Sequence, residues 1–206
     1  MQVGVFLLTQ LFAQCAPSVA PETLMPLVSV ESAQEPFAVA NITDNTSHYF
    51  DKQSDAVKFL NTLTRQGKNF SAGLMQINAK NFSGLGLTNE TVFDYCTNIK
   101  AGSKILENCY LKTTKKEKNE QVAIRNALSC YYSGNEKRGY KKESNGTSYI
   151  ERIEMKSIRG KLPVVPALIT GNQSTGKNIQ NKSFLIMDAE NEGWDIFKDY
   201  LKSDSQ

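Results

Sequence analysis

The chain has few of the residues that build metal centres. Its 206 residues include one histidine, His48, and four cysteines that lie far apart, with no C-x-x-C pair. Zinc sites usually combine closely spaced cysteines and histidines, so we expect no metal and no cofactor. Long hydrophobic runs are absent as well, and the apolar opening stretch is too short to cross a bilayer. We therefore expect no membrane span.

The charge is modest but unevenly spread. The formal net charge is +3, and the basic residues cluster at 112–118 and 137–142. Such clusters favour a polyanionic partner, either a nucleic acid or an acidic cell-wall polymer. No nucleic-acid-binding motif accompanies them. The preferred interpretation is a solvated helix end and loop, without a nucleic-acid partner.

One stretch, 21–32, organises the rest of the chain. The stretch predicts a helix with an apolar stripe of Leu24, Leu27 and Val28 at positions i, i+3 and i+4. The next position on this stripe is Glu31, so a carboxyl group would face inward. Burial disfavours the charged form and raises the pKa, as a general acid near neutral pH requires. On this helix alone, a solvated residue at the helix end stays the alternative.

The opening residues 1–15 pose a targeting question. Their apolar run resembles part of a signal peptide, but a basic start and a clear cleavage site are missing. The helical spacing of Val5, Leu8 and Phe12 favours a first core helix.

Four more amphipathic helices are expected. One is capped by Ser54, one runs over 97–111, one is capped by Asn119 and carries Tyr131 inward, and one is capped by Thr147. Two cysteines, 109 and 130, lie on apolar stripes and could be small core residues. Disulfides are possible too, but spacing alone does not pair the four cysteines.

The remaining stretches are irregular. We expect a loop over 35–53, with His48 as an ordinary loop residue, and short strands or a compact loop layer over 69–88 that lines a cleft. A purely structural hairpin over 69–88 is the alternative. Residues 1–160 would form one mainly helical α+β domain. Residues 161–206 would form a linker and an irregular tail, whose apolar positions either bind a partner or fold back.

Four separated pieces resemble a known family. They are the pair Glu31-Ser32 at a helix end, GLMQIN at 73–78, ALSCYYSGN at 127–135, and YIERI at 149–153. Their residues and order are similar to the motifs of lytic transglycosylases with a lysozyme-like domain. Two further pieces, CAPSVAPETL at 15–24 and VFDYCTNIKAGSKIL at 92–106, resemble the specialised members of type IV secretion and conjugation systems.

The resemblance implies a fold and an activity. It implies a lysozyme-like fold in which a small hairpin or loop region lines the substrate cleft. It also implies cleavage of the peptidoglycan bond between N-acetylmuramic acid and N-acetylglucosamine, with a 1,6-anhydromuramoyl product. In that chemistry Glu31 serves as both acid and base. The protein would act in the periplasm or cell envelope, as a monomer, with secretion-system components as possible partners of the tail.

The resemblance also implies residue roles. It suggests substrate-binding or acid-orienting roles for five positions: Ser32, Gln76, Asn78, Tyr131 and Tyr149. It further implies that Gly73 and Met75 shape the cleft floor and that Cys15 and Cys96 form a disulfide.

The sequence departs from the family pattern near the proposed acid. Ala33 stands where Gly is usual, Glu35 replaces Asn before a proline, Tyr132 replaces Asn, and Pro26 lies inside the helix. A two-carboxylate glycosidase would need a second acid, for which Glu35 and the loop residues at 44 and 51 are poor candidates. The alternatives are a hydrolytic muramidase and a non-catalytic peptidoglycan-binding scaffold.

Overall fold

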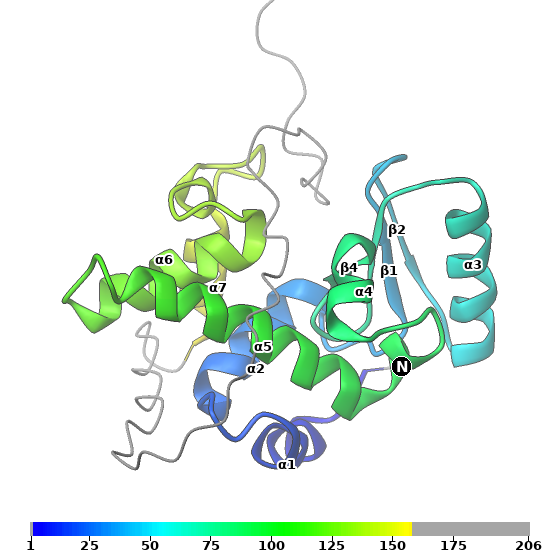
Figure 1. Ribbon diagram of the computed structural model, residues 1–206, viewed down its shortest axis with the longest axis horizontal. Helices are drawn as coiled ribbons and strands as arrows, with labels where there is room; N and C mark the ends of the chain where they lie inside the picture. Colours follow the sequence, from blue (N-terminus) through cyan, green and yellow to red (C-terminus); the bar gives the residue numbers. More distant parts are fainter. Residues whose placement is uncertain (1, 158–206) are drawn as a thin grey trace, which may run out of the picture.

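The computed structural model describes residues 2–157 (Figure 1). The predicted domain boundary and the 161–206 tail lie outside these residues. The helices are α1 (Val5–Cys15), α2 (Pro21–Ser32), α3 (Gln53–Arg65), α4 (Phe82–Leu85), α5 (Tyr95–Thr113), α6 (Glu120–Ser133) and α7 (Tyr149–Lys156). Short 3₁₀ turns lie at η1 (Ala79–Asn81), η2 (Thr91–Phe93) and η3 (Arg138–Tyr140). The strands are β1 (Ala38–Asn41), β2 (Thr46–Tyr49), β3 (Phe70–Ala72) and β4 (Ile77–Asn78).

The helices form the larger part of the described chain. The long helix α5 packs against α1 and α6, while α2 packs against α1 and α7 (Figure 1). The stripe that the sequence predicts on α2 is fully buried at Leu24, Leu27 and Val28. Burial of each such side chain contributes about 1.5–3 kcal/mol of hydrophobic stabilisation. The expected mainly helical, lysozyme-like α+β fold is confirmed.

A small antiparallel sheet stands beside the helices (Figure 1). Its strand order is β2-β1-β3-β4, and Val39 of β1 lies opposite both His48 of β2 and Ala72 of β3. The strands expected within 69–88 are present, but the expected loop over 35–53 is wrong. All four residues of β1 are buried, whereas β2 is a mostly exposed polar edge strand. Neither strand therefore shows the alternation of polar and apolar residues that predicts a strand.

The assignment of His48 as a loop residue is also wrong. His48 lies in β2, its Nε2 is 2.9 Å from the Thr46 hydroxyl, and its ring lies 4.4 Å from that of Phe59 in α3. The ring therefore helps to pack α3 against the outer strand.

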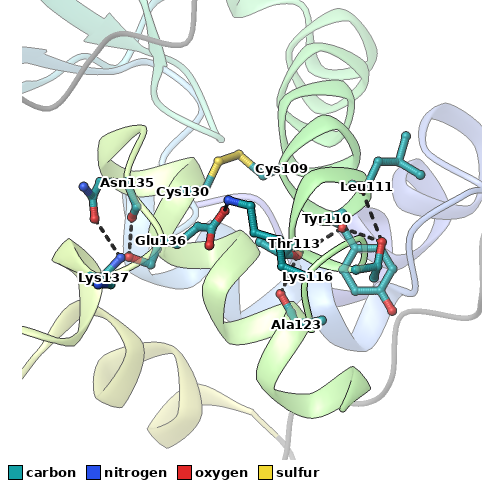
Figure 2. Close-up of polar contacts among 12 residues, drawn as sticks. Cys109, Tyr110, Leu111, Thr113, Lys116, Ala123, Cys130, Asn135, Glu136 and Lys137 are labelled. Atoms are coloured by element: carbon teal, nitrogen blue, oxygen red, sulfur yellow. Dashed lines mark hydrogen bonds and ion pairs between the residues drawn. A yellow bond between two sulfur atoms is a disulfide. The ribbon is translucent and has the colours of Figure 1, made fainter. Parts of the chain in front are cut away.

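Two disulfides fix the helices. Cys15 at the end of α1 is bonded to Cys96 at the start of α5, which confirms that pairing. Cys109 and Cys130 are not simply small core residues, because they form a second disulfide between α5 and α6 (Figure 2). Both helices carry their cysteine on the buried stripe, so the packing that hides the thiols also brings them together. Beside this bond, the Thr113 hydroxyl donates to the Ala123 carbonyl at 2.9 Å.

Three local expectations need correction. Ser54 does not cap α3, which begins one residue earlier, after Lys52. The cap of α7 is Ser148 and not Thr147, because the Ser148 hydroxyl and the Glu151 carboxylate each accept from the other's backbone N–H. In α1, Leu8 and Phe12 are buried, but Val5 is 58% exposed in the first turn. Over the described range, no helix combines the length and the apolar character needed to cross a membrane.

Candidate active site

Two adjoining hollows meet at Glu31 and Gln76, which line both of them. We call the two hollows together the cleft. Its helical side is formed by α2, α5 and α6, and its sheet side by β1–β4 with the adjoining turns. The helical side adds Ile105, Tyr131 and Tyr132, and the sheet side adds Ser47, Tyr49, Ser71 and Asn78. Segments as far apart in the sequence as Glu31 and Tyr132 therefore meet in one cleft.

Glu31 lies in the last turn of α2 and points inward, as its place on the apolar stripe predicts. The residue is only 8% exposed. The helix ends directly after Ser32, because Ala33 adopts a left-handed conformation with φ 52°. Glycine adopts this conformation without strain, which explains why the family pattern favours Gly at this position. The chain then turns away towards β1 and leaves the Glu31 carboxyl at the cleft.

The surroundings of Glu31 favour its protonated form. The Tyr149 hydroxyl donates a hydrogen bond to Oε1 of Glu31. Desolvation by burial raises the pKa of Glu31 from 4.5 to about 7, although the Tyr149 hydrogen bond and the positive charge of Arg152 both act to lower it. Burial is the dominant effect, since the two opposing interactions do not restore the ordinary value. A carboxyl group with a pKa near 7 can donate a proton at neutral pH.

Tyr131 lies in the same cleft, but its hydroxyl has another partner. The half-buried side chain donates to the Met75 carbonyl at 2.5 Å and thus links α6 to the turn between β3 and β4. Burial, with a smaller contribution from the Glu31 charge, raises the pKa of Tyr131 well above its usual value. The phenol therefore stays protonated, and its single O–H is engaged in the hydrogen bond to the Met75 carbonyl. Of the two tyrosines expected beside the acid, Tyr149 makes the direct hydrogen bond.

The sheet side places two amides in the cleft. Gln76 has φ 45° and its Nε2 donates to the carbonyls of Ala38, at 3.1 Å, and Gly73, at 2.9 Å. Asn78 is buried, its Nδ2 lies 3.4 Å from the Ser71 hydroxyl, and its Oδ1 accepts from the Lys80 backbone at 3.0 Å. Because these bonds fix both side chains, the amides offer preset polar groups to a ligand in the cleft.

The turn that carries Gly73 and Met75 is held by Asn98, a residue that the sequence analysis did not single out. Asn98 in α5 accepts from the Met75 N–H at 2.8 Å and donates to the carbonyls of Ala72 and Val92. Gly73 has φ 82°, and a Cβ atom there would lie 2.2 Å from the Asn98 amide nitrogen. The turn therefore requires a glycine at this position.

Gly102 provides the space for Met75. A Cβ atom at Gly102 would lie 2.5 Å from the Met75 sulfur, so the side chain packs directly against the backbone of α5. The motif that begins at Cys96 and reads CTNIKAG thus contains a disulfide cysteine, the clamp Asn98 and this glycine. Asn98 and Gly102 thus connect this motif directly to the GLMQIN segment.

The other expected positions lie at or near the cleft. Ser32 is buried, and its hydroxyl donates back to the Val28 carbonyl at 3.2 Å. Asp44, considered as a second acid, accepts hydrogen bonds from Lys68 and Asn41, which lower its pKa. Among residues 2–157, Glu31 is the only carboxyl group that lines either hollow.

Comparisons with known proteins give the family of this chain. The chain belongs to the Transglycosylase SLT domain family, whose model matches residues 10–153. It is 39% identical over 141 residues to the type IV secretion system protein virB1 of Brucella suis biovar 1, covering 68% of this chain and 59% of that protein. It is 33% identical over 191 residues to protein virB1 of Rhizobium radiobacter, covering 92% of this chain and 71% of that protein. No solved structure gives a significant match.

Proposed function

We propose that this chain is a peptidoglycan lytic transglycosylase. It cleaves the β-1,4 bond between N-acetylmuramic acid and N-acetylglucosamine in the periplasm or cell envelope. Local cleavage opens the wall for a type IV secretion or conjugation apparatus. The family and the names of the virB1 relatives support this proposal, although the chain spans only 59% of the length of the Brucella relatives.

The single observation that carries the proposal is the buried Glu31 carboxyl in the cleft. Its pKa of about 7 keeps much of it protonated near neutral pH. In the first step the carboxyl donates its proton to the glycosidic oxygen, and the bond between that oxygen and the anomeric carbon breaks. Glu31 becomes a carboxylate, to which the Tyr149 hydroxyl donates.

In the second step the same carboxylate acts as a base. It takes the proton of the 6-hydroxyl group of the muramic acid while that oxygen bonds to the anomeric carbon. The product is the 1,6-anhydro sugar, Glu31 is protonated again, and no water is consumed. One carboxyl group suffices for this sequence, which fits a cleft lined by Glu31 as its only carboxyl group in the described chain.

The surrounding side chains have supporting roles in this proposal. Gln76 and Asn78 bind the sugar beside the cleaved bond, and the Gly73–Met75 turn forms the floor beneath them. Tyr131 and Tyr149 orient the reacting groups, and Ser32 binds substrate or the acid. The protein acts as a monomer on glycan strands, without a cofactor, and the 161–206 segment contacts secretion-system components.

The test is digestion of purified sacculi by the wild type and Glu31→Gln, with the products identified by mass spectrometry. We expect anhydromuropeptides from the wild type and none from Glu31→Gln. Asp44→Asn is the control, because Asp44 does not line the cleft, and it should retain activity. Retained release by Glu31→Gln would contradict the assignment. Reducing-end products would identify a hydrolytic muramidase, and binding without any release would identify a scaffold.

A further inference from the structure

A chain of largely buried contacts leads away from Glu31 through Tyr149. Tyr149 donates to Glu31, and the Tyr149 ring stacks on the ring of Tyr132, with 4.3 Å between centroids and 15° between planes. The Tyr132 hydroxyl donates to Oε1 of Glu143 at 3.0 Å. The other oxygen of Glu143 accepts from Nη1 of Arg152. The guanidinium of Arg152 in turn lies 5.9 Å from the centre of the Tyr149 ring, so the last residue of the chain of contacts is again next to the first.

We propose that Glu143 and Arg152 are positioning residues, which fix the stacked Tyr132 and Tyr149 rings and place one positive charge near the Glu31 carboxyl. The proposal rests on the proposed role of Glu31 as proton donor. Neither residue lines the cleft hollows, so both would act through the tyrosines and through the electric field.

The ion pair is buried enough to act as a fixed element. The side chains of Arg152 and Glu143 are 17% and 3% exposed. A buried carboxylate of this kind requires a partner, since without one it would be an uncompensated buried charge. The pair and the Tyr132 hydroxyl therefore hold one another in place, and the Tyr149 ring is fixed between Tyr132 and Arg152.

Tyr132 stands where the family pattern has Asn, and its phenol makes the contacts to both Tyr149 and Glu143. An asparagine side chain has no ring to stack on Tyr149 and is too short to replace the phenol that reaches Glu143. Tyr132 is 7% exposed and lines the cleft beside Glu31. The departure from the pattern is thus tied to the buried pair.

The charge of Arg152 acts on Glu31 in a defined direction. It opposes burial and lowers the pKa of Glu31, together with the Tyr149 hydrogen bond. The other titratable groups around Glu31 are Tyr131 and Tyr132 from α6, Tyr149 from α7, and Tyr49 from β2. All four are phenols, so Arg152 is the cation among the groups that act on Glu31.

The test follows the Glu31 carboxyl directly, by NMR titration of protein labelled with ¹³C at the glutamate carboxyl carbon. The Glu31 signal is identified as the one missing from Glu31→Gln. We expect Arg152→Gln to raise the pKa of Glu31 and Arg152→Lys to stay near the wild-type value, because lysine retains the charge. The control is Arg125→Gln, which breaks a different ion pair, that of Arg125 in α6 with Glu154 in α7, and should leave the Glu31 titration unchanged.

A second variant keeps the test decisive if Arg152→Gln alone fails to fold. The double variant Glu143→Gln/Arg152→Gln removes both charges and leaves no unpaired buried carboxylate. It should also raise the pKa of Glu31. An unchanged titration in the folded variant would overturn the proposal.

Activity separates this inference from the proposed function. Wild-type activity should fall about tenfold between pH 6 and pH 8 if the protonated form of a group with pKa near 7 is required. In Arg152→Gln, or in the double variant, this fall should begin at higher pH. Suppose that anhydromuropeptide release depends on Glu31 but follows the same pH profile in the wild type and in the Arg152 variant. This result would contradict the inference and leave the proposed function intact. If Arg152→Gln shifts the Glu31 titration but the wild type releases no anhydromuropeptides, the inference stands and the proposed function fails.

Discussion

The two sides of the cleft differ in the kind of chemistry that they carry. The helical side holds the groups that can exchange or stabilise charge, namely Glu31, Tyr131, Tyr149 and, behind them, the Glu143–Arg152 pair. The sheet side presents mainly amides, hydroxyls and backbone, as at Ser71, Gln76 and Asn78. In the proposed function, proton transfer and ligand recognition would thus fall to different structural units.

The difference follows from how each side is built. Helices packed by long apolar stripes can bury a carboxyl group, and burial is what raises the pKa of Glu31. The short strands and turns of the sheet side instead fix polar side chains through local hydrogen bonds, as the two bonds from Gln76 illustrate. Under the proposed function, burial would therefore supply the reactivity of the helical side, and fixed polar groups would supply recognition on the sheet side.

The largest effect should come from breaking the sheet side at Gly73. We expect Gly73→Ala to cost about 4 kcal/mol of unfolding free energy, because the left-handed φ of 82° is strained for alanine and the new Cβ would clash with Asn98. Gly67→Ala is the matched control, since φ is 65° and a Cβ atom there would meet no other atom within 4 Å. It should cost about 1 kcal/mol. The measurement is urea unfolding. Equal losses of unfolding free energy in Gly73→Ala and Gly67→Ala would contradict close packing of the turn against α5.

The next effect concerns the stability of the helical side. The folded-state pKa of Glu31, about 7, lies above its ordinary value of 4.5. The stabilisation from its protonated form is therefore complete below pH 4.5 and is lost as the pH rises through 7. Glu31→Gln should gain about 3 kcal/mol relative to the wild type between pH 4.5 and pH 8. The measurement is urea unfolding of both proteins at the two pH values. The same difference in unfolding free energy at pH 4.5 and pH 8 would contradict the burial of Glu31.

Smaller effects on activity are expected from one variant on each side of the cleft, measured in the same assay. Tyr149→Phe removes a hydrogen bond that lowers the pKa of Glu31, so the alkaline limb of activity should move to higher pH. Asn78→Ala should raise KM about fivefold, as expected for the loss of about 1 kcal/mol of hydrogen bonding, and leave the alkaline limb in place. The measurement is the pH profile of sacculus solubilisation for both variants. A shifted limb in Asn78→Ala would remove the distinction between the two sides.

The helical side could be predicted largely from the sequence. The stripe on α2 follows directly from residue spacing, and that spacing points Glu31 inward. The motif resemblance supplied Tyr149 and the Cys15–Cys96 pairing, neither of which spacing alone could give. Local periodicity and recurring motifs carry this information because they act within one helix or are repeated across a family.

The sheet side and the outer contacts were less predictable, for physical reasons. The buried strand β1 and the exposed strand β2 lack alternation, so their pairing is decided by neighbours distant in the chain. Glu143 lies in a polar loop that reads as solvated, yet its carboxylate is buried against Arg152 and Tyr132. Only the folded arrangement brings these three residues together.

The most direct test of the account asks whether one proton on Glu31 controls the reaction. The NMR titration of the Glu31 carboxyl in the wild type is compared with the alkaline limb of anhydromuropeptide release, measured in the same buffers. The account predicts that both have a midpoint at about pH 7. A Glu31 titration near the ordinary value of 4.5, or activity that persists after Glu31 has lost its proton, would contradict it.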